Sequence, residues 1–270
     1  QGAAFYARKA LEIFEDLGDR EGIVLARLRL GDHGAYRGKL EDALSHYQKA
    51  LALAAEGGVR AQQAWAHWGL GYTLYQQLSL RAAREHLERA RELFEAVGNQ
   101  RREMAVLSAL SDIDRMAGRF DQARDRLMRV FDVFEAQGAN SSMVAANLAM
   151  VHLLKGRREE ARHWLEVAES RLPEEALGHA VLRTVALALA PGASDEARWS
   201  AAHREVIEAL EYSDFVDVDI AFMLENAAKV SATCQYAERA AKTWSLSADV
   251  WSRLDLTKRA EAARARAVRS

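Results

Sequence analysis

The chain has 270 residues, of which half are hydrophobic and 28% are charged, and its formal net charge of −2 provides no positive field to attract nucleic acid. Its single cysteine, Cys234, excludes an intramolecular disulfide and favours a reducing, cytoplasmic location. No apolar stretch reaches the ~18 residues of a membrane span, and the abundance of Ala, Leu, Arg and Glu predicts an all-α protein.

Residues 1–18 form the first predicted helix, and the pattern at its end returns later in the chain. Ile13, Phe14 and Leu17 share one face of a helix, and Gly18 follows at the position where a left-handed residue ends many helices. The same class of glycine follows the later copies, at Gly58, Gly98 and Gly138. These glycines are therefore predicted to separate structural repeats.

A frame of five residues recurs at an offset of 40 between residues 24 and 138. Its members are mostly small or apolar, and the three copies are Leu30, Gly31, Ala43, Tyr47 and Ala50; Leu70, Gly71, Ala83, Leu87 and Ala90; and Leu110, Ser111, Ala123, Leu127 and Val130. Such repetition is typical of stacked helix pairs, because a single pair cannot bury its apolar face alone.

A second class of glycine lies inside the repeats and predicts the turn between the two helices of a pair. Each member precedes an alanine by five residues, which places a small residue where the second helix packs closely; the members are Gly38, Gly118 and Gly156. In the second repeat Leu78 takes the place of the glycine, so we expect an altered turn there.

The pattern weakens after Pro173, although parts of a fifth and a sixth copy remain, with Pro191 in the fifth turn. The surviving positions are Gly192, Ala197, Ala201, Ala240, Trp244, Val250, Trp251 and Leu254. Residues 256–269 are predicted to form a final helix that covers the end of the array. Three arginines would keep its outer face in water, namely Arg264, Arg266 and Arg269.

The combination Leu-Gly, then Gly-x-x-x-x-Ala-x-x-x-Tyr-x-x-Ala, within residues 30–50, resembles the tetratricopeptide repeat, in its long-period variant of about 40 residues. HEAT and armadillo repeats have a compatible period but do not use this pattern of small residues. The resemblance implies a right-handed superhelical solenoid of antiparallel helix pairs, spanning residues 1–270. We expect a half repeat at 1–18, repeats at 19–58, 59–98, 99–138 and 139–171, degenerate repeats at 172–213 and 214–255, and a capping helix at 256–270.

The second repeat carries an aromatic stripe along its first helix. The stripe consists of Trp65, Trp68, Tyr72 and Tyr75, which fall within roughly 80° of one another on a helical wheel. The opposite side of the helix carries the packing stripe of His67, Leu70, Gly71 and Leu74. In the tetratricopeptide family the first helix of each repeat lines a concave groove that contacts ligands. The resemblance therefore implies a partner-binding site with candidate residues Trp65, Trp68, Tyr72, Tyr75, Asp32, Tyr36, Asp112 and Arg115.

The same frame places further residues along this groove: Leu25, Leu28, Ser108, Met116, Met143, Met150 and Leu153. An aromatic centre flanked by a few charges suits the anchoring of a peptide or a helix. The alternative is that the aromatic stripe packs between neighbouring repeats as part of the core, which is the commoner role of aromatic residues at helical spacing.

The histidines do not predict a metal centre. His46 and His86 occupy equivalent positions 40 residues apart, so they could share a metal ion, but Arg126 fills the next copy and no third ligand accompanies them. Two half-exposed surface histidines are the simpler interpretation. No nucleotide-binding, zinc-protease or hydrolase motif is present either, so we expect neither an enzyme nor a cofactor.

An acidic cluster near the start of the last degenerate repeat also has two interpretations. Asp214, Asp217 and Asp219 could bind a cation. A helix start explains them more simply, because carboxylates accept hydrogen bonds from the free amide groups there.

These observations predict a non-catalytic scaffold that binds a protein or peptide segment, including a neighbouring domain of the same chain. The chain begins at Gln1, without a methionine and partway through a repeat, so we expect a fragment of a larger bacterial signalling or regulatory protein. The alternative is a structural or homo-oligomerisation module, in which residues 173–255 self-associate through Phe222, Trp244 or Trp251. Acidic residues at groove positions argue against a nucleic-acid partner.

Overall fold

The computed structural model describes residues 2–172, 179–190, 196–212 and 216–270, and within these ranges it contains fourteen helices and no strand. The predicted all-α fold class is therefore confirmed. The chain divides into two compact units, Gln1–Arg119 and Phe120–Ser270. Four positions on which predictions rested, Pro173, Pro191, Gly192 and Asp214, lie outside the described residues.

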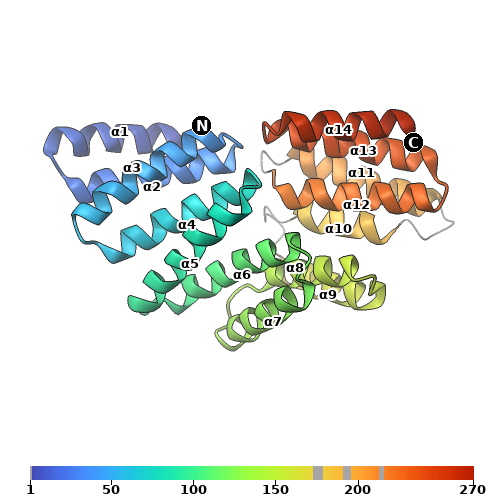
Figure 1. Cartoon of the computed structure of the whole chain (residues 1–270), viewed down its shortest axis with the longest axis horizontal. Helices are drawn as coiled ribbons and strands as arrows, with labels where there is room; N and C mark the ends of the chain where they lie inside the picture. Colours follow the sequence, from blue (N-terminus) through green and yellow to red (C-terminus); the bar gives the residue numbers. More distant parts are fainter. Residues whose placement is uncertain (1, 173–178, 191–195, 213–215) are drawn as a thin grey trace. The chain divides into compact units, whose positions relative to one another are not determined.

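The first unit runs from helix α1 to helix α6: α1 (Gly2–Leu17), α2 (Arg20–Tyr36), α3 (Leu40–Glu56), α4 (Arg60–Gln76), α5 (Leu80–Ala96) and α6 (Gln100–Met116). Each helix packs against the next one in the chain (Figure 1). Helix α4 also contacts α2 and α6, so these three first helices of successive pairs form one continuous face.

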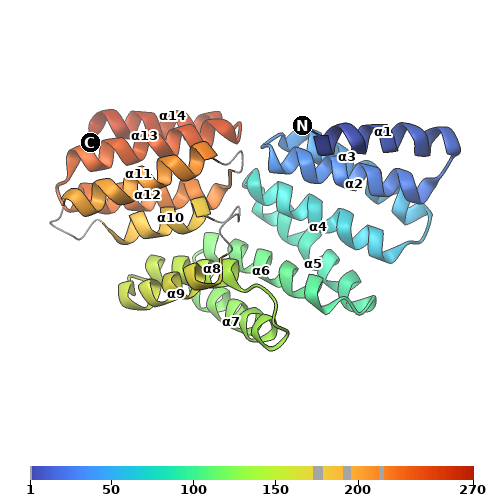
Figure 2. The same ribbon diagram turned by 180° about the vertical axis from the view of Figure 1, so that it is seen from behind.

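The second unit runs from helix α7 to helix α14: α7 (Phe120–Ala136), α8 (Ser142–Leu154), α9 (Arg158–Arg171), α10 (His179–Leu189), α11 (Glu196–Tyr212), α12 (Val218–Thr233), α13 (Ala237–Arg253) and α14 (Thr257–Arg269). Figure 2 shows α10 beside α12, and α13 beside the terminal helix α14. The helix pairs α2/α3, α4/α5 and α8/α9 fall within predicted repeat ranges, whereas the boundary between the two units falls inside the range 99–138. A single solenoid of repeats stays a prediction.

The repeated frame forms the core of each helix pair. The alanines that begin the second helices, Ala43, Ala83 and Ala123, have no exposed surface, and Leu87 and Leu127 are equally buried. Small residues at these positions let the two helices of a pair approach closely. Leu87 lies against Gly71 of its own pair, where an added Cβ would be 2.6 Å from its side chain. The frame thus marks the positions where packing has the least freedom.

Glycines end the helices in the left-handed conformation that the sequence predicts. Gly18, Gly58, Gly98 and Gly138 have φ between 62° and 69°, and the glycines inside the repeats have φ between 72° and 76°. Leu78, however, has a φ of 61°, and the turn keeps the same pair of hydrogen bonds, so the expected altered turn is wrong. The hydrogen bonds that close the helix offset the roughly 1–2 kcal/mol that a side chain costs in this conformation.

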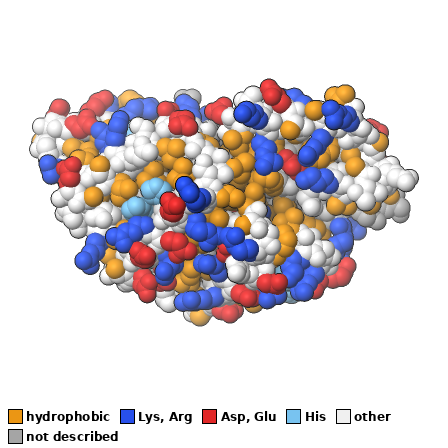
Figure 3. Space-filling view, in the orientation of Figure 1, with side chains coloured by type: hydrophobic (Ala, Val, Ile, Leu, Met, Phe, Trp, Pro, Cys, Tyr) orange, Lys and Arg blue, Asp and Glu red, His pale blue; other side chains and the backbone are white. Residues whose placement is uncertain are grey.

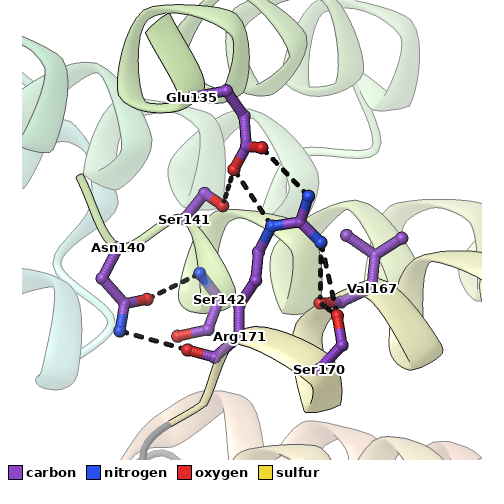
Figure 4. A network of polar contacts seen from close by, with 7 residues as sticks. All are labelled: Glu135, Asn140, Ser141, Ser142, Val167, Ser170 and Arg171. Atoms are coloured by element: carbon purple, nitrogen blue, oxygen red, sulfur yellow. Dashed lines mark hydrogen bonds and ion pairs between the residues drawn. The ribbon is translucent and has the colours of Figure 1, made fainter. Parts of the chain in front are cut away.

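A polar network lies between the third and fourth repeats (Figure 4), where Gly156 and Ala161 follow Gly118 and Ala123 by 38 residues instead of 40. Glu135 near the end of α7 accepts hydrogen bonds from Nε and Nη2 of Arg171, at 3.0 and 2.9 Å, and a third from Ser141 (Figure 4). Asn140 accepts from the amide of Ser142 and donates to the carbonyl of Arg171. The network therefore joins the loop before α8 to the last turns of α7 and α9.

The terminal helices confirm one prediction and correct another. Arg264, Arg266 and Arg269 of α14 are exposed, as expected for a covering helix. Trp244 is only 4% exposed and Trp251 is fully buried, because α14 covers them and Arg266 lies over the ring of Trp244. These two tryptophans therefore offer no apolar surface for self-association. Within the described ranges, no helix combines the length and the apolar character needed to cross a membrane.

Adjacent glycines after α3 provide a matched test of the turn. Gly58 has a φ of +67° with open space where a Cβ would lie, whereas Gly57 has a φ of −80° and room for a methyl group. We expect Gly58→Ala to lower the free energy of unfolding by about 1 kcal/mol through backbone strain alone. Gly57→Ala should leave it unchanged or raise it by about 0.5 kcal/mol. Chemical denaturation followed by circular dichroism measures both, and equal effects would contradict the assigned turn.

Candidate functional site

The face formed by α2, α4 and α6 of the first unit contains a small recess. It has a volume of about 100 Å³ and lies between α2 and α4, lined by Leu25, Leu28, Arg29, Asp32 and Trp65. Three of these residues, Leu25, Leu28 and Asp32, are groove positions predicted from the first repeat, and Trp65 belongs to the predicted aromatic stripe. The structure therefore brings predicted residues of two successive repeats together.

Three of the four stripe aromatics form a continuous half-buried surface. The rings of Trp65 and Trp68 meet edge to face with centroids 5.6 Å apart, and Trp68 stacks on Tyr72 at 6.3 Å. On the α6 side, the guanidinium carbon of Arg102 lies 4.2 Å from the centroid of a Trp65 ring, a cation–π arrangement. This surface offers stacking and apolar contact together with a positive charge.

The other stripe residue, Tyr75, and the predicted specificity residue Arg115 are buried, whereas Asp112 is partly exposed. Tyr75 is 3% exposed, and its hydroxyl accepts a hydrogen bond of 3.2 Å from Nη2 of Arg115, which is equally buried. Asp112 is half-buried, with its carboxylate 3.7 Å from the same guanidinium. In this conformation Tyr75 and Arg115 present no surface to a partner. The direct contacts predicted for the remaining residues, including the half-buried Tyr36, stay predictions.

Among the described residues, Asp32 is the one carboxylate that lines the recess. The hydroxyl of Tyr47 donates a hydrogen bond of 2.7 Å to its Oδ1, and Nη1 of Arg29 lies 3.4 Å from its Oδ2. Burial nevertheless raises the pKa of Asp32 above its usual value, because loss of hydration outweighs the hydrogen bond from Tyr47 and the positive charge of Arg29. The fold thus holds a partly exposed carboxylate in a place that disfavours its charge.

Tyr47, which holds this carboxylate by its hydrogen bond, comes from α3, the second helix of the pair. The ring of Tyr47 packs directly against Gly31 of α2 and Gly69 of α4. A Cβ added to Gly31 would lie 2.6 Å from the nearest ring atom, and a Cβ added to Gly69 would lie 2.3 Å from it. Sequence analysis placed Tyr47 in the core frame but missed its hydroxyl as a site residue. The available signal was that the other copies have leucine at this position, at Leu87 and Leu127.

Arg102 is the second residue that the sequence analysis missed. It lies in the first turn of α6, where Asn99 caps the helix by accepting a hydrogen bond of 3.2 Å from its amide. Burial and the neighbouring Arg101 and Arg29 lower the pKa of the Arg102 guanidinium. Elsewhere on α5 and α6, arginine side chains alternate with Asp and Glu side chains along the sequence, and Figure 3 shows positive and negative side chains intermixed on the face that it draws.

The second unit has its own recess, of about 340 Å³, between α9, α10 and α11. It is lined by small and apolar residues such as Leu165, Ala186 and Ala202, and by exposed charged residues such as Arg198 and Glu205. The predicted groove positions of α8 do not contribute to it. Met150 and Leu153 are buried, and Met143 is exposed.

The structure shows which groups the acidic cluster and the histidines contact. Asp217 caps α12 by accepting a hydrogen bond of 2.7 Å from the amide of Asp219, which confirms the helix-start interpretation. His86 contacts His67 of α4, a contact that the sequence analysis did not predict, and His46 and His86 are both half-buried. Among the described residues no group of three or more His, Cys, Asp or Glu side chains is arranged to hold a metal ion.

Comparison with known families identifies the repeats. Residues 24–96 and 62–136 match the family model of the tetratricopeptide repeat. Residues 24–136 thus resemble tetratricopeptide repeats, as their sequence pattern predicts. A search of curated proteins gave no match.

Solved structures share the fold over nearly the whole chain at low sequence identity. A Rap protein complexed with the competence and sporulation factor is 12% identical, with a TM-score of 0.79, covering 94% of this chain and 71% of that one. The Rap conjugation regulator of plasmid pLS20, in complex with the Phr* peptide, is 16% identical, with a TM-score of 0.66 and coverage of 92% and 75%. NprR in complex with its cognate peptide NprX is 13% identical, with a TM-score of 0.66 and coverage of 94% and 80%.

Removing the charge of Asp32 should stabilise the protein in a pH-dependent way. Because the folded-state pKa is raised, the native state binds more protons than the unfolded state between the two pKa values, and wild type loses stability as the pH rises through this window. Asp32→Asn has no such loss. Urea unfolding should therefore show a larger advantage of Asp32→Asn at pH 7 than at pH 3.5.

The Tyr47→Phe background sharpens this measurement. Removing the hydroxyl takes away a hydrogen bond that lowers the pKa of Asp32, so the advantage of Asp32→Asn at pH 7 should increase. An advantage that is equal at both pH values in both backgrounds would show that burial does not disfavour the charge of Asp32.

Proposed function

We propose that the chain is a non-catalytic binding module that captures a peptide segment along the face of α2, α4 and α6. The observation that carries the proposal is the recess beside Trp65, where apolar walls from α2 and α4 meet the carboxylate of Asp32. Its volume of about 100 Å³ is well below the roughly 300 Å³ of a typical small-molecule pocket. It suits one apolar side chain of a longer ligand.

The aromatic surface beside the recess supports an extended ligand. Half-buried Trp65, Trp68 and Tyr72 follow the axis of α4, so a chain that anchors one side chain in the recess can continue over their rings. Trp and Tyr are the residue types that contribute most to binding energy when they become fully covered. Asp32 and Arg102 add one charge of each sign, which sets the orientation of a ligand that carries complementary charges.

The related folds support the same class of ligand. The plasmid regulator and NprR were each solved in complex with a peptide, and the Rap protein in complex with the competence and sporulation factor; the fold of each extends over more than nine-tenths of this chain. A peptide supplied by a separate molecule or by a neighbouring domain of the same chain would meet the requirements of the recess equally. We place the module in a larger signalling or regulatory protein, in which the bound segment is the signal.

A selection experiment tests the proposal. Random linear heptapeptides displayed on phage are selected on the wild-type chain, and the affinities of synthetic copies are measured by calorimetry. Trp65→Ala should weaken binding by at least tenfold, corresponding to about 1.4 kcal/mol or more, and Asp32→Asn should change the charge preference of the selected peptides. Tyr212→Ala removes an aromatic side chain that is 92% exposed on α11 and should change affinity less than twofold.

Two outcomes would overturn the proposed site. Selected peptides that bind Trp65→Ala and Asp32→Asn like wild type, but lose affinity in Arg198→Ala, would move the site to the recess of the second unit. Failure to select any peptide whose binding depends on Trp65, with all variants folded by circular dichroism, would remove the peptide-binding function from this face.

A further inference from the structure

The charged groups around the recess of the first unit are unequal in number. Arg29 and Asp32 line the recess, and Arg102 lies over the ring of Trp65, which belongs to the same lining. Arg101 precedes Arg102 in the first turn of α6 and is exposed. The charges of Arg29 and Arg101 both act on Arg102. Among the described residues, the recess thus combines three nearby guanidinium groups with the single carboxylate of Asp32.

The carboxylate of Asp32 already has partners within the protein. Its Oδ1 accepts the hydrogen bond of 2.7 Å from the hydroxyl of Tyr47, and its Oδ2 lies 3.4 Å from Nη1 of Arg29. Burial also disfavours the charged form of this carboxylate and raises its pKa. A cation on a ligand would have to compete with Tyr47 and Arg29, so Asp32 is a poor receptor for a positively charged ligand.

Arg102, by contrast, carries a partly buried charge that no carboxylate compensates directly. Its guanidinium carbon lies 4.2 Å from the centroid of a Trp65 ring, and among the described residues neither Arg102 nor Arg101 forms an ion pair. Burial and the like charges of Arg101 and Arg29 lower the pKa of this guanidinium, against the opposing charge of Asp32. A carboxylate brought by a ligand would compensate this charge, and the N–H groups of a guanidinium match the two oxygens of a carboxylate.

These positions define the chemical class of the peptide. The recess suits one apolar side chain, Arg29 belongs to its α2 wall, and Arg102 lies on the α6 side of Trp65. We propose that the bound peptide carries an Asp or Glu side chain that lies between Arg29 and Arg102, beside the apolar side chain in the recess. This inference rests on the proposed peptide function and adds to it that the ligand is acidic. Charge complementarity between the arginines and the ligand is the argument that carries it.

Three phage libraries of random heptapeptides test the charge preference. All contain the uncharged residues; one adds Glu, one adds Lys and one adds no charged residue. Clones that lose binding to Trp65→Ala should come mainly from the library with Glu. Their synthetic copies, with acetylated and amidated ends, are measured by calorimetry, and replacing Glu by Gln in the peptide should weaken binding to wild type by about fivefold or more.

Variants of the chain assign this advantage of Glu over Gln to individual residues. Arg29→Gln and Arg102→Gln should each reduce it to less than about twofold, as in a double-mutant cycle that removes both partners of one contact. Asp32→Asn should increase it, because the opposing charge is removed. Arg129→Gln removes an exposed arginine of α7 and is the matched control, which should keep the advantage of wild type.

The outcomes separate this inference from the proposed function. Peptides that depend on Trp65 but bind equally with Glu or Gln, or that bind only with a free C-terminal carboxylate, would overturn the acidic side chain and leave the peptide function intact. An advantage of Glu that persists in both arginine variants would also overturn it. If one arginine variant fails to fold by circular dichroism, the other decides. Failure of all three libraries to yield a peptide that depends on Trp65 would overturn both proposals.

Discussion

The packing of the Tyr47 ring between two glycines is the contact on which the first unit depends most. A methyl group on either Gly31 or Gly69 would overlap this ring, so the distance between α2 and α4 is set by an aromatic side chain that comes from α3. Neither helix could approach or rotate without meeting it. Overpacking of such a core typically costs about 1–3 kcal/mol, which makes the spacing of these helices a well-defined property of the sequence.

The same ring connects the core to the candidate site. Its hydroxyl passes between the two first helices and reaches Asp32, which lines the recess that their spacing creates. The carboxylate is held where burial disfavours its charge, an arrangement that lowers stability at neutral pH and is common at functional sites. Packing and recognition are therefore linked through one residue, and a change in helix spacing would move the recess and its charge together.

Much of the fold could be predicted because the helices and turns of each repeat depend on residues that are close to one another in the sequence. The offset of 40 residues located the helix pairs, and glycine identity located the left-handed turns, since both depend on residues that are close in sequence. Leu78 was not predictable in this way. A leucine gives no local reason to adopt a positive φ, and only the hydrogen bonds of the completed turn impose it.

The candidate site was predicted less completely, because a helical wheel shows on which side of a helix a residue lies but does not show which residues of other helices it contacts. The wheel placed Tyr75 with the other stripe aromatics, but Arg115 of the next first helix buries it. The wheel also assigned His67 to packing, and nothing in one helix indicated that His86 would meet it. The contributions of Tyr47 and Arg102 likewise depend on contacts between helices that single-helix patterns do not contain.

The repeat itself supplies the comparison that tests the packing claim. Forty residues after Tyr47 and Gly69, the corresponding positions hold the smaller Leu87 and the larger Ala109. A double-mutant cycle measured by urea unfolding therefore compares Gly69→Ala in wild type and in Tyr47→Leu, whose side chain lacks the ring atoms nearest to Gly69. We predict a loss of about 2 kcal/mol in wild type and less than about 0.5 kcal/mol in Tyr47→Leu. Equal losses in the two backgrounds would show that the Tyr47 ring does not set the spacing of α2 and α4.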